Sequence, residues 1–126
     1  MNQPKVLIAD DNTTVRRILT QFLNVGDRRV LEAADGDAAL VLAREHLPDL
    51  IILDVRMPGR DGHQVCSELR QQEATRHIPV LMLSGVGALS EEYLGTSNGA
   101  DDYLSKPFNF HDLESRVNAL LGRSPR

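Results

Sequence analysis

The stretch that decides the fold is residues 49–54, which read DLIILD. Its four central residues are apolar without alternation, which is typical of a strand buried on both faces in a parallel sheet covered by helices. Residues 5–9 (KVLIA) and 78–83 (IPVLML) have the same character. These three segments therefore predict the central strands of one sheet.

Two more segments indicate more exposed strands. Residues 29–33 (RVLEA) contain Arg29 and Glu32, and residues 102–104 form a brief segment that begins with an acid. Charged and short strands are usual at the edges of sheets, where they discourage pairing with other chains. We expect these two strands, the second and the fifth, to be the edges.

The segments between the strands have the apolar spacing and the start signals of helices. Because strands and helices alternate, the fold class is α/β, a flavodoxin-like doubly wound five-stranded parallel sheet of order 2-1-3-4-5 with five helices. We expect these elements to form one domain, residues 1–121, and residues 122–126 to be a tail or the start of a linker. Apolar spacing is seen at Val15, Ile18, Leu19, Phe22 and Leu23 and at Leu113, Val117, Leu120 and Leu121, and the starts are marked by Asn12 or Thr13, Asp35, Ser90 and Asn109 with Asp112. The third helix is expected from about Gly62 to Gln72.

Length and composition exclude several classes of protein. A chain of 126 residues has room for one domain, and its net charge of -4 disfavours direct binding of nucleic acid by this domain. The longest apolar runs have four or five residues, too few to span a membrane. The single cysteine, Cys66, and a start without a charged apolar leader lead us to expect a cytoplasmic protein.

Three acids are predicted to converge at one edge of the sheet. Asp10 and Asp11 follow the first strand and Asp54 closes the third, which lies next to it in the predicted order. The pair alone would be explained by a solvated turn or a helix cap, but three adjacent carboxylates repel one another unless a cation shares their charge. Hard oxygen ligands that leave room for water and phosphate favour Mg²⁺.

An ionised Asp54 in this position could also be a nucleophile for a phosphoryl group. Such a reaction requires charge neutralisation and a hydrogen-bond donor more than covalent help. Ser84 follows the fourth strand and Lys106 the fifth, so the predicted sheet places both at the same edge.

Four stretches of the chain match one known pattern in the order in which they occur: residues 8–12 (IADDN), 53–62 (LDVRMPGRDG), 83–85 (LSG) and 99–108 (GADDYLSKPF). Together they resemble the receiver domain of two-component response regulators, and the resemblance covers nearly the whole chain. It implies a chemotaxis-regulator-like switch in phosphorelay signal transduction, a phosphoprotein rather than an enzyme, that assists its own phosphoryl transfer and dephosphorylation.

The resemblance also implies roles for single residues. Asp54 would accept the phosphoryl group from a sensor histidine kinase or a phosphotransfer protein. Mg²⁺ would be bound by Asp11, Asp54 and the Arg56 carbonyl, with Asp10 acting through a water molecule. Ser84 and Lys106 would contact the phosphoryl group, and the peptide bond between Lys106 and Pro107 would be cis.

The expected output is a change of the surface formed by the fourth helix, the fifth strand and the fifth helix. Ser84 would move toward the phosphoryl group and Tyr103 would rotate into the vacated space. Asp101, Asp102 and Arg116 could then pair across a homodimer formed on activation.

Two other classes of function remain open at this point. A phosphohydrolase could use Asp54 as its nucleophile, although haloacid-dehalogenase-like enzymes place a second Asp two residues later, where this chain has Arg56. A flavodoxin-like nucleotide or flavin binding module would need a phosphate loop after the first strand, where Asp10 and Asp11 would repel phosphate without a metal.

Overall fold

The computed structural model describes residues 3–85 and 99–123. Its strands are β1 (Lys5–Ala9), β2 (Arg29–Ala33), β3 (Leu50–Asp54), β4 (Val80–Ser84) and β5 (Asp102–Ser105). They form one sheet in the order β2-β1-β3-β4-β5, and each neighbouring pair is parallel. The sheet order and both edge strands are as predicted, and this order is the flavodoxin-like one.

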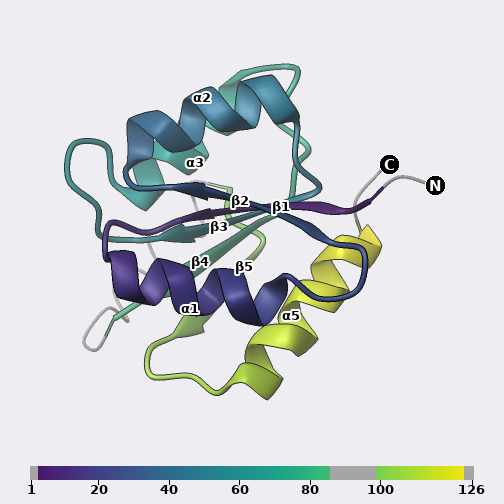
Figure 1. Cartoon of the computed structure of the whole chain (residues 1–126). Coiled ribbons are helices and arrows are strands. Elements are labelled where there is room, and N and C mark those ends of the chain that lie inside the picture. Colours follow the sequence, from purple (N-terminus) through teal and green to yellow (C-terminus); the bar gives the residue numbers. More distant parts are fainter. Residues whose placement is uncertain (1–2, 86–98, 124–126) are drawn as a thin grey trace.

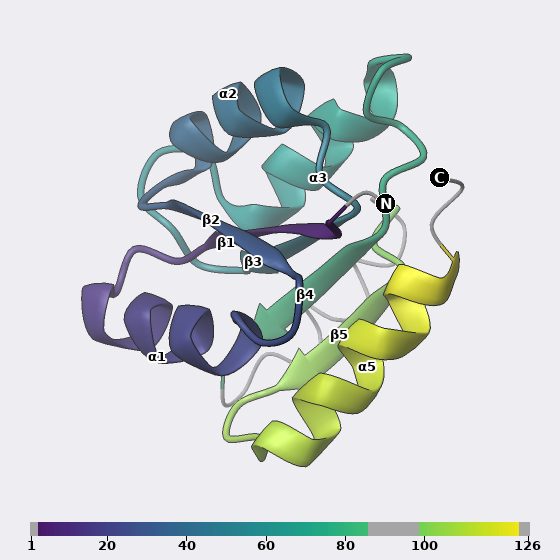
Figure 2. The ribbon, with the colours of Figure 1, turned by 45° about the vertical axis from the view of Figure 1, so that its right-hand side comes forward.

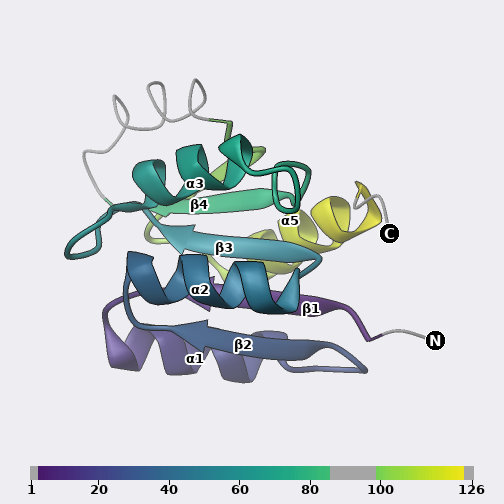
Figure 3. The ribbon, with the colours of Figure 1, turned by 90° about the horizontal axis from the view of Figure 1, so that it is seen from above.

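Helices cover both faces of the sheet. They are α1 (Thr13–Leu23), α2 (Gly36–His46), α3 (Gly62–Gln71) and α5 (Phe110–Arg123). Figures 1 and 2 show α2 and α3 on one face and α1 and α5 on the other, and Figure 3 looks down on the α2 and α3 layer with the strands beneath it. The predicted helix starting at Ser90 lies outside the described residues.

The core consists of two apolar clusters, one on each face of the sheet. In β1, Leu7 and Ala9 belong to the cluster with α2 and α3, whereas Val6 and Ile8 belong to the cluster with α1 and α5. Successive side chains of a strand point to opposite faces, so an unbroken apolar strand supplies both clusters.

None of the helices in the described part of the chain is long and apolar enough to cross a membrane.

Three helices begin at polar caps that the sequence indicates. The side-chain oxygens of Asn12, Asp35 and Asn109 accept hydrogen bonds from the backbone N–H three residues later, at 3.0, 2.8 and 2.7 Å. Each bond satisfies a donor that the first turn of a helix leaves without a partner. These caps fix the turns that follow β1 and β2 and the loop after β5.

The boundaries of some elements differ from the prediction. The strand expected to start at Ile78 starts at Val80, because Pro79 has no N–H to donate to the sheet and the Ile78 N–H donates to the carbonyl of Thr75 at 3.1 Å. The other differences are of one or two residues: β4 ends at Ser84, β5 at Ser105, α3 at Gln71 and α5 at Arg123.

Candidate functional site

Three carboxylates meet at the carboxyl end of the sheet. Asp10 and Asp11 follow β1, and Asp54 is the last residue of β3. The two strands are adjacent and parallel, with Ala9 opposite Leu53, so the residues that follow emerge at the same edge. One oxygen from each acid belongs to a group whose members all lie within 4.8 Å of one another. The structure therefore brings together the three acids that the sequence singles out.

Asp10 is held from several sides and is 1% exposed. Its N–H donates to the Ala33 carbonyl at 3.2 Å, and its Oδ1 accepts a hydrogen bond from the Asn12 N–H at 2.9 Å. Its Oδ2 is buried and accepts no hydrogen bond from the described residues, and Lys106 Nζ lies 3.6 Å away. A buried carboxylate oxygen without a donor is unfavourable, so a cation or its water is a suitable partner for this atom.

Asp54 lies in an environment that disfavours its charge. Burial is the largest cause that raises its pKa above the ordinary value, and the negative charge of Asp10 is the second. Lys106 opposes this effect through its charge and through a hydrogen bond from Nζ to Asp54 Oδ1 at 3.3 Å. The backbone of Arg56 also donates to Asp54 and lowers its pKa. The pKa of Asp54 is raised on balance, so Lys106 offsets only part of the effects of burial and of Asp10.

Ser84 and Lys106 lie at the same edge of the sheet. Ser84 is the last residue of β4 and is fully buried. The Lys106 N–H donates to the Ser84 carbonyl at 2.6 Å, and the peptide bond between Lys106 and Pro107 is cis. Lys106 Nζ is close to both buried acids, 3.6 Å from Asp10 Oδ2 and 3.3 Å from Asp54 Oδ1.

Close packing fixes the loop that follows Asp54 and carries Arg56. The Gly62 N–H donates to the Val55 carbonyl at 2.9 Å, and a Cβ at Gly62 would lie 2.5 Å from the Asp54 carbonyl oxygen. A larger residue at this position would push α3 away from the site. Asp61 caps α3 in a capping box, which sets the direction in which the loop enters the helix.

One residue beside the acids is not indicated by the sequence. Arg16 of α1 donates from Nη1 to the Asp10 carbonyl at 2.6 Å, and its side chain is only 12% exposed. In the sequence it is one of two adjacent arginines in an amphipathic helix, and such residues usually lie on the solvated face. Only the packing of α1 against β1 distinguishes Arg16 from Arg17, which is exposed.

The residues expected to respond to the site lie on β5 and α5. Arg116 Nη1 donates to Asp102 Oδ1 at 2.8 Å and also to the Tyr103 carbonyl. Asp101 accepts a hydrogen bond from Arg70 Nη2 at 2.8 Å. These bonds lie within one chain, so pairing between two copies would require Arg116 to exchange partners.

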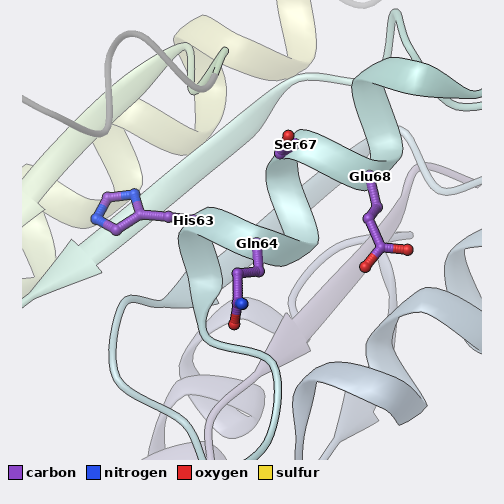
Figure 4. A pocket seen from close by; sticks show the side chains of 4 residues that line it. All are labelled: His63, Gln64, Ser67 and Glu68. Carbon is purple, nitrogen blue, oxygen red and sulfur yellow. The ribbon is translucent and has the colours of Figure 1, made fainter.

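A pocket on the surface of α3 lies apart from these residues. It is lined by His63, Gln64, Ser67 and Glu68. Figure 4 shows that the four side chains point in different directions and do not converge. None of the residues expected at the site lines this pocket, and no chemistry is assigned to it.

The carboxylate cluster is suited to a hard divalent cation. Its ligands are oxygens, its exposed member Asp11 leaves the site open to water, and the buried Asp10 Oδ2 accepts no hydrogen bond from the described residues. Mg²⁺ prefers one or two carboxylates together with water and phosphate oxygens. The residues present therefore fit a Mg²⁺ ion that keeps water and phosphoryl oxygens among its ligands better than they fit an ion enclosed by protein ligands alone.

Comparisons with known proteins identify the family to which the chain is similar. The family model described as the response regulator receiver domain matches residues 6–118. The probable transcriptional regulator ycf27 of Cyanophora paradoxa is 41% identical over 98% of this chain and 51% of its own length. The DNA-binding dual master transcriptional regulator RpaA of Synechocystis is 42% identical over 98% of this chain and 51% of its own length.

Solved structures are similar as well. The crystal structure of a putative response regulator from Chloroflexus aurantiacus has a TM-score of 0.91 at 39% identity, covering 96% of this chain and 99% of that chain. The chain spans about half the length of the curated relatives it matches. By fold, motifs and relatives alike, this chain belongs to the response regulator receiver domain family of two-component signalling.

Proposed function

We propose that Asp54 accepts a phosphoryl group from a phosphohistidine of a sensor histidine kinase or a phosphotransfer protein, in the presence of Mg²⁺. One observation carries this proposal. Three carboxylates lie within 4.8 Å of one another, and Lys106 Nζ lies 3.3 Å from the Asp54 oxygen. Such a cluster is unfavourable at rest and becomes favourable when a divalent cation offsets its negative charge, and that cation together with Lys106 can then receive the oxygens of a phosphoryl group.

The chain supplies the ligands that this cation needs. Asp11, Asp54 and the Arg56 carbonyl would hold Mg²⁺ directly, and Asp10 would hold one of its waters. When bound, the ion would neutralise negative charge on the carboxylates and on the transferring phosphoryl oxygens. Lys106, placed between Asp10 and Asp54, would pair with a further phosphoryl oxygen.

The transfer itself exchanges one bond for another. A carboxylate oxygen of Asp54 forms a bond to phosphorus while the bond between phosphorus and the histidine nitrogen breaks. The electron pair of that bond stays on the imidazole nitrogen, which takes up a proton from solvent. The chain's part is to hold Asp54 in line and to supply positive charge and donors.

The output follows from groups that contact the phosphoryl group. On β4, Leu83 is the register partner of Asp54, and the next residue is Ser84, which is buried. The Ser84 hydroxyl is therefore the nearest candidate donor from β4. A shift of Ser84 would change the space available to Tyr103 on β5. The surface around β5 and α5 would thereby respond to phosphorylation.

Intact-mass measurement tests the acceptor. With acetyl phosphate and Mg²⁺ we expect the wild-type chain to gain one phosphoryl group, and we expect Asp54→Asn to gain none. Asp49→Asn is the matched control, because it changes the same residue type at the other end of β3. A gain that survives Asp54→Asn, or no gain by the wild type with any phosphoryl donor, would contradict the assignment.

We further propose that activation favours a homodimer through Asp101, Asp102 and Arg116. The Arg116 bonds to Asp102 and to the Tyr103 carbonyl would exchange for bonds to a second copy. Sedimentation of the resting protein and of its beryllofluoride complex checks this, with Arg116→Ala as the variant that should stay monomeric. A beryllofluoride complex that remains monomeric would assign this face to a different partner.

A further inference from the structure

The inference concerns Arg16 and rests on the proposed function of the acid cluster as a Mg²⁺ site. Arg16 lies in the second turn of α1, and its side chain extends back toward the start of the helix, as long helical side chains generally do. Nη1 donates to the Asp10 carbonyl at 2.6 Å, and Nε donates to Glu32 Oε1 at 3.1 Å. The guanidinium thus joins α1 to the end of β1 and to the edge strand β2.

The carbonyl that Arg16 holds belongs to the peptide unit between Asp10 and Asp11. The other contacts of Asp10 fix its N–H and its Oδ1, but they do not fix the rotation of this peptide unit. Rotation there would swing the Cα–Cβ bond of Asp11. Asp11 is exposed, and no hydrogen bond or ion pair from the described residues holds its carboxylate, so its position depends on the backbone.

We propose that Arg16 is a positioning residue for the Mg²⁺ site: by holding the Asp10 carbonyl it sets the Asp10–Asp11 peptide unit and places the Asp11 carboxylate beside Asp54. Glu32 holds Arg16 in turn, because its carboxylate accepts from Nε while Nη1 reaches the carbonyl. The planar guanidinium suits this double task, whereas an ammonium offers one point charge. The Arg16 side chain is 12% exposed, which limits the other conformations it can adopt.

A simple effect of charge would have the opposite sign. A cation near three carboxylates repels Mg²⁺, so removing Arg16 would tighten Mg²⁺ binding if charge alone mattered. Removing a group that places a ligand weakens binding instead, typically by tenfold or more. The direction of the change in Mg²⁺ affinity therefore separates the two roles.

The experiment is a calorimetric titration of Mg²⁺ into the metal-free wild type, Arg16→Gln and Arg17→Gln. Arg17 is the matched control, because it has the same charge on the same helix and is exposed. We expect Arg16→Gln to weaken Mg²⁺ binding roughly tenfold and Arg17→Gln to change it by less than about twofold. Arg16→Lys should restore part of the affinity, since one of the two acceptors can still be reached.

Thermal unfolding of each variant verifies that the titrated protein is folded. If Arg16→Gln does not fold, Glu32→Gln provides the test, because it leaves Arg16 in place but weakens its anchor and should reduce Mg²⁺ affinity by about threefold. If the wild type binds Mg²⁺ and Arg16→Gln and Arg17→Gln have equal affinities, this inference alone is overturned. Where Glu32→Gln is used instead, an unchanged Mg²⁺ affinity in that variant overturns it. No Mg²⁺ binding by the wild type would contradict the proposed function, and the inference with it.

Discussion

The two ends of the sheet both carry aspartates, but the aspartates have opposite surroundings. At the amino end, Asp49 precedes β3 and accepts a hydrogen bond from the Lys5 N–H at 2.8 Å. Asp101 precedes β5 and accepts from the Val80 N–H and from Arg70, each at 2.8 Å. These acids satisfy strand donors and a guanidinium, so they stabilise the fold.

At the carboxyl end, acids face one another instead. Asp10, Asp11 and Asp54 gather within 4.8 Å, and Lys106 approaches two of them at 3.3 and 3.6 Å. Burial first and the charge of Asp10 second raise the pKa of Asp54, and Lys106 offsets these two effects only in part. The aspartates at the amino end therefore stabilise the fold, whereas those at the carboxyl end concentrate negative charge, as the proposed Mg²⁺ and phosphoryl site requires.

The largest effect is expected at the amino end, for Arg70→Met. Arg70 donates to the carbonyls of Gly99, Arg76 and Ile78 at 3.0, 3.1 and 2.7 Å, and to Asp101. Methionine keeps the apolar stem and removes every donor, so the free energy of unfolding in urea should fall by about 3 kcal/mol. Arg17→Met, at an exposed arginine, is the control. Equal losses of unfolding free energy for the two variants would show that the contacts of Arg70 do not stabilise the amino end of the sheet.

A second variant at the amino end is Asp49→Ala. It leaves the Lys5 N–H without its carboxylate partner beside a buried strand. We expect the free energy of unfolding to fall by roughly 2 kcal/mol, independent of Mg²⁺. Urea unfolding with and without Mg²⁺ checks this, with the exposed Asp27→Ala as control. A loss that appears only with Mg²⁺ would connect Asp49 to the metal and blur the distinction between the two ends.

At the carboxyl end, Asp11→Asn should act on the metal and not on the fold. We expect Mg²⁺ affinity, measured by calorimetry, to fall by about tenfold, because a charged oxygen ligand is lost. Asp27→Asn removes the same charge from an exposed loop and should leave the affinity nearly unchanged. An unchanged affinity in Asp11→Asn would remove Asp11 from the site.

Most of the sheet and its acid cluster could be predicted, because they follow from local patterns. Unbroken apolar runs mark the central strands, and in a parallel sheet the residues after Ala9 and Leu53 must emerge together. The predicted start of β4 was wrong because the apolar run from Ile78 does not show that Pro79, which lacks an N–H, delays the strand to Val80. The predicted pairing of Asp102 and Arg116 across a dimer stays untested, although the two form an ion pair within the chain.

The supporting arginines could not be predicted. Arg16 and Arg70 lie in amphipathic helices whose polar residues look alike in the sequence. Which of them reaches a backbone carbonyl depends on how each helix sits on the sheet. No periodicity carries that information, because long charged side chains can end in solvent or turn inward with small changes of packing.

The smallest expected change concerns Asp54 in the absence of Mg²⁺. Because the pKa of Asp54 is raised in the folded state, its protonated carboxyl favours folding and its ionisation opposes folding. The stability that the protonated carboxyl provides is complete below the unfolded pKa of 3.8 and is lost as pH rises through the raised folded pKa. At neutral pH, Asp54→Asn should therefore raise the free energy of unfolding of the metal-free protein by on the order of 1 kcal/mol. The gain should shrink as the solution is acidified toward the unfolded value.

The most direct test of the contrast between the two ends is urea unfolding of wild type and Asp54→Asn at neutral pH, first without and then with saturating Mg²⁺. We predict that the order reverses: Asp54→Asn is the more stable protein without Mg²⁺, and the wild type is the more stable protein with it, because only the complete cluster binds the ion tightly. If the wild type is more stable than Asp54→Asn in both conditions, the acids at the carboxyl end do not oppose folding at rest, and the account is contradicted.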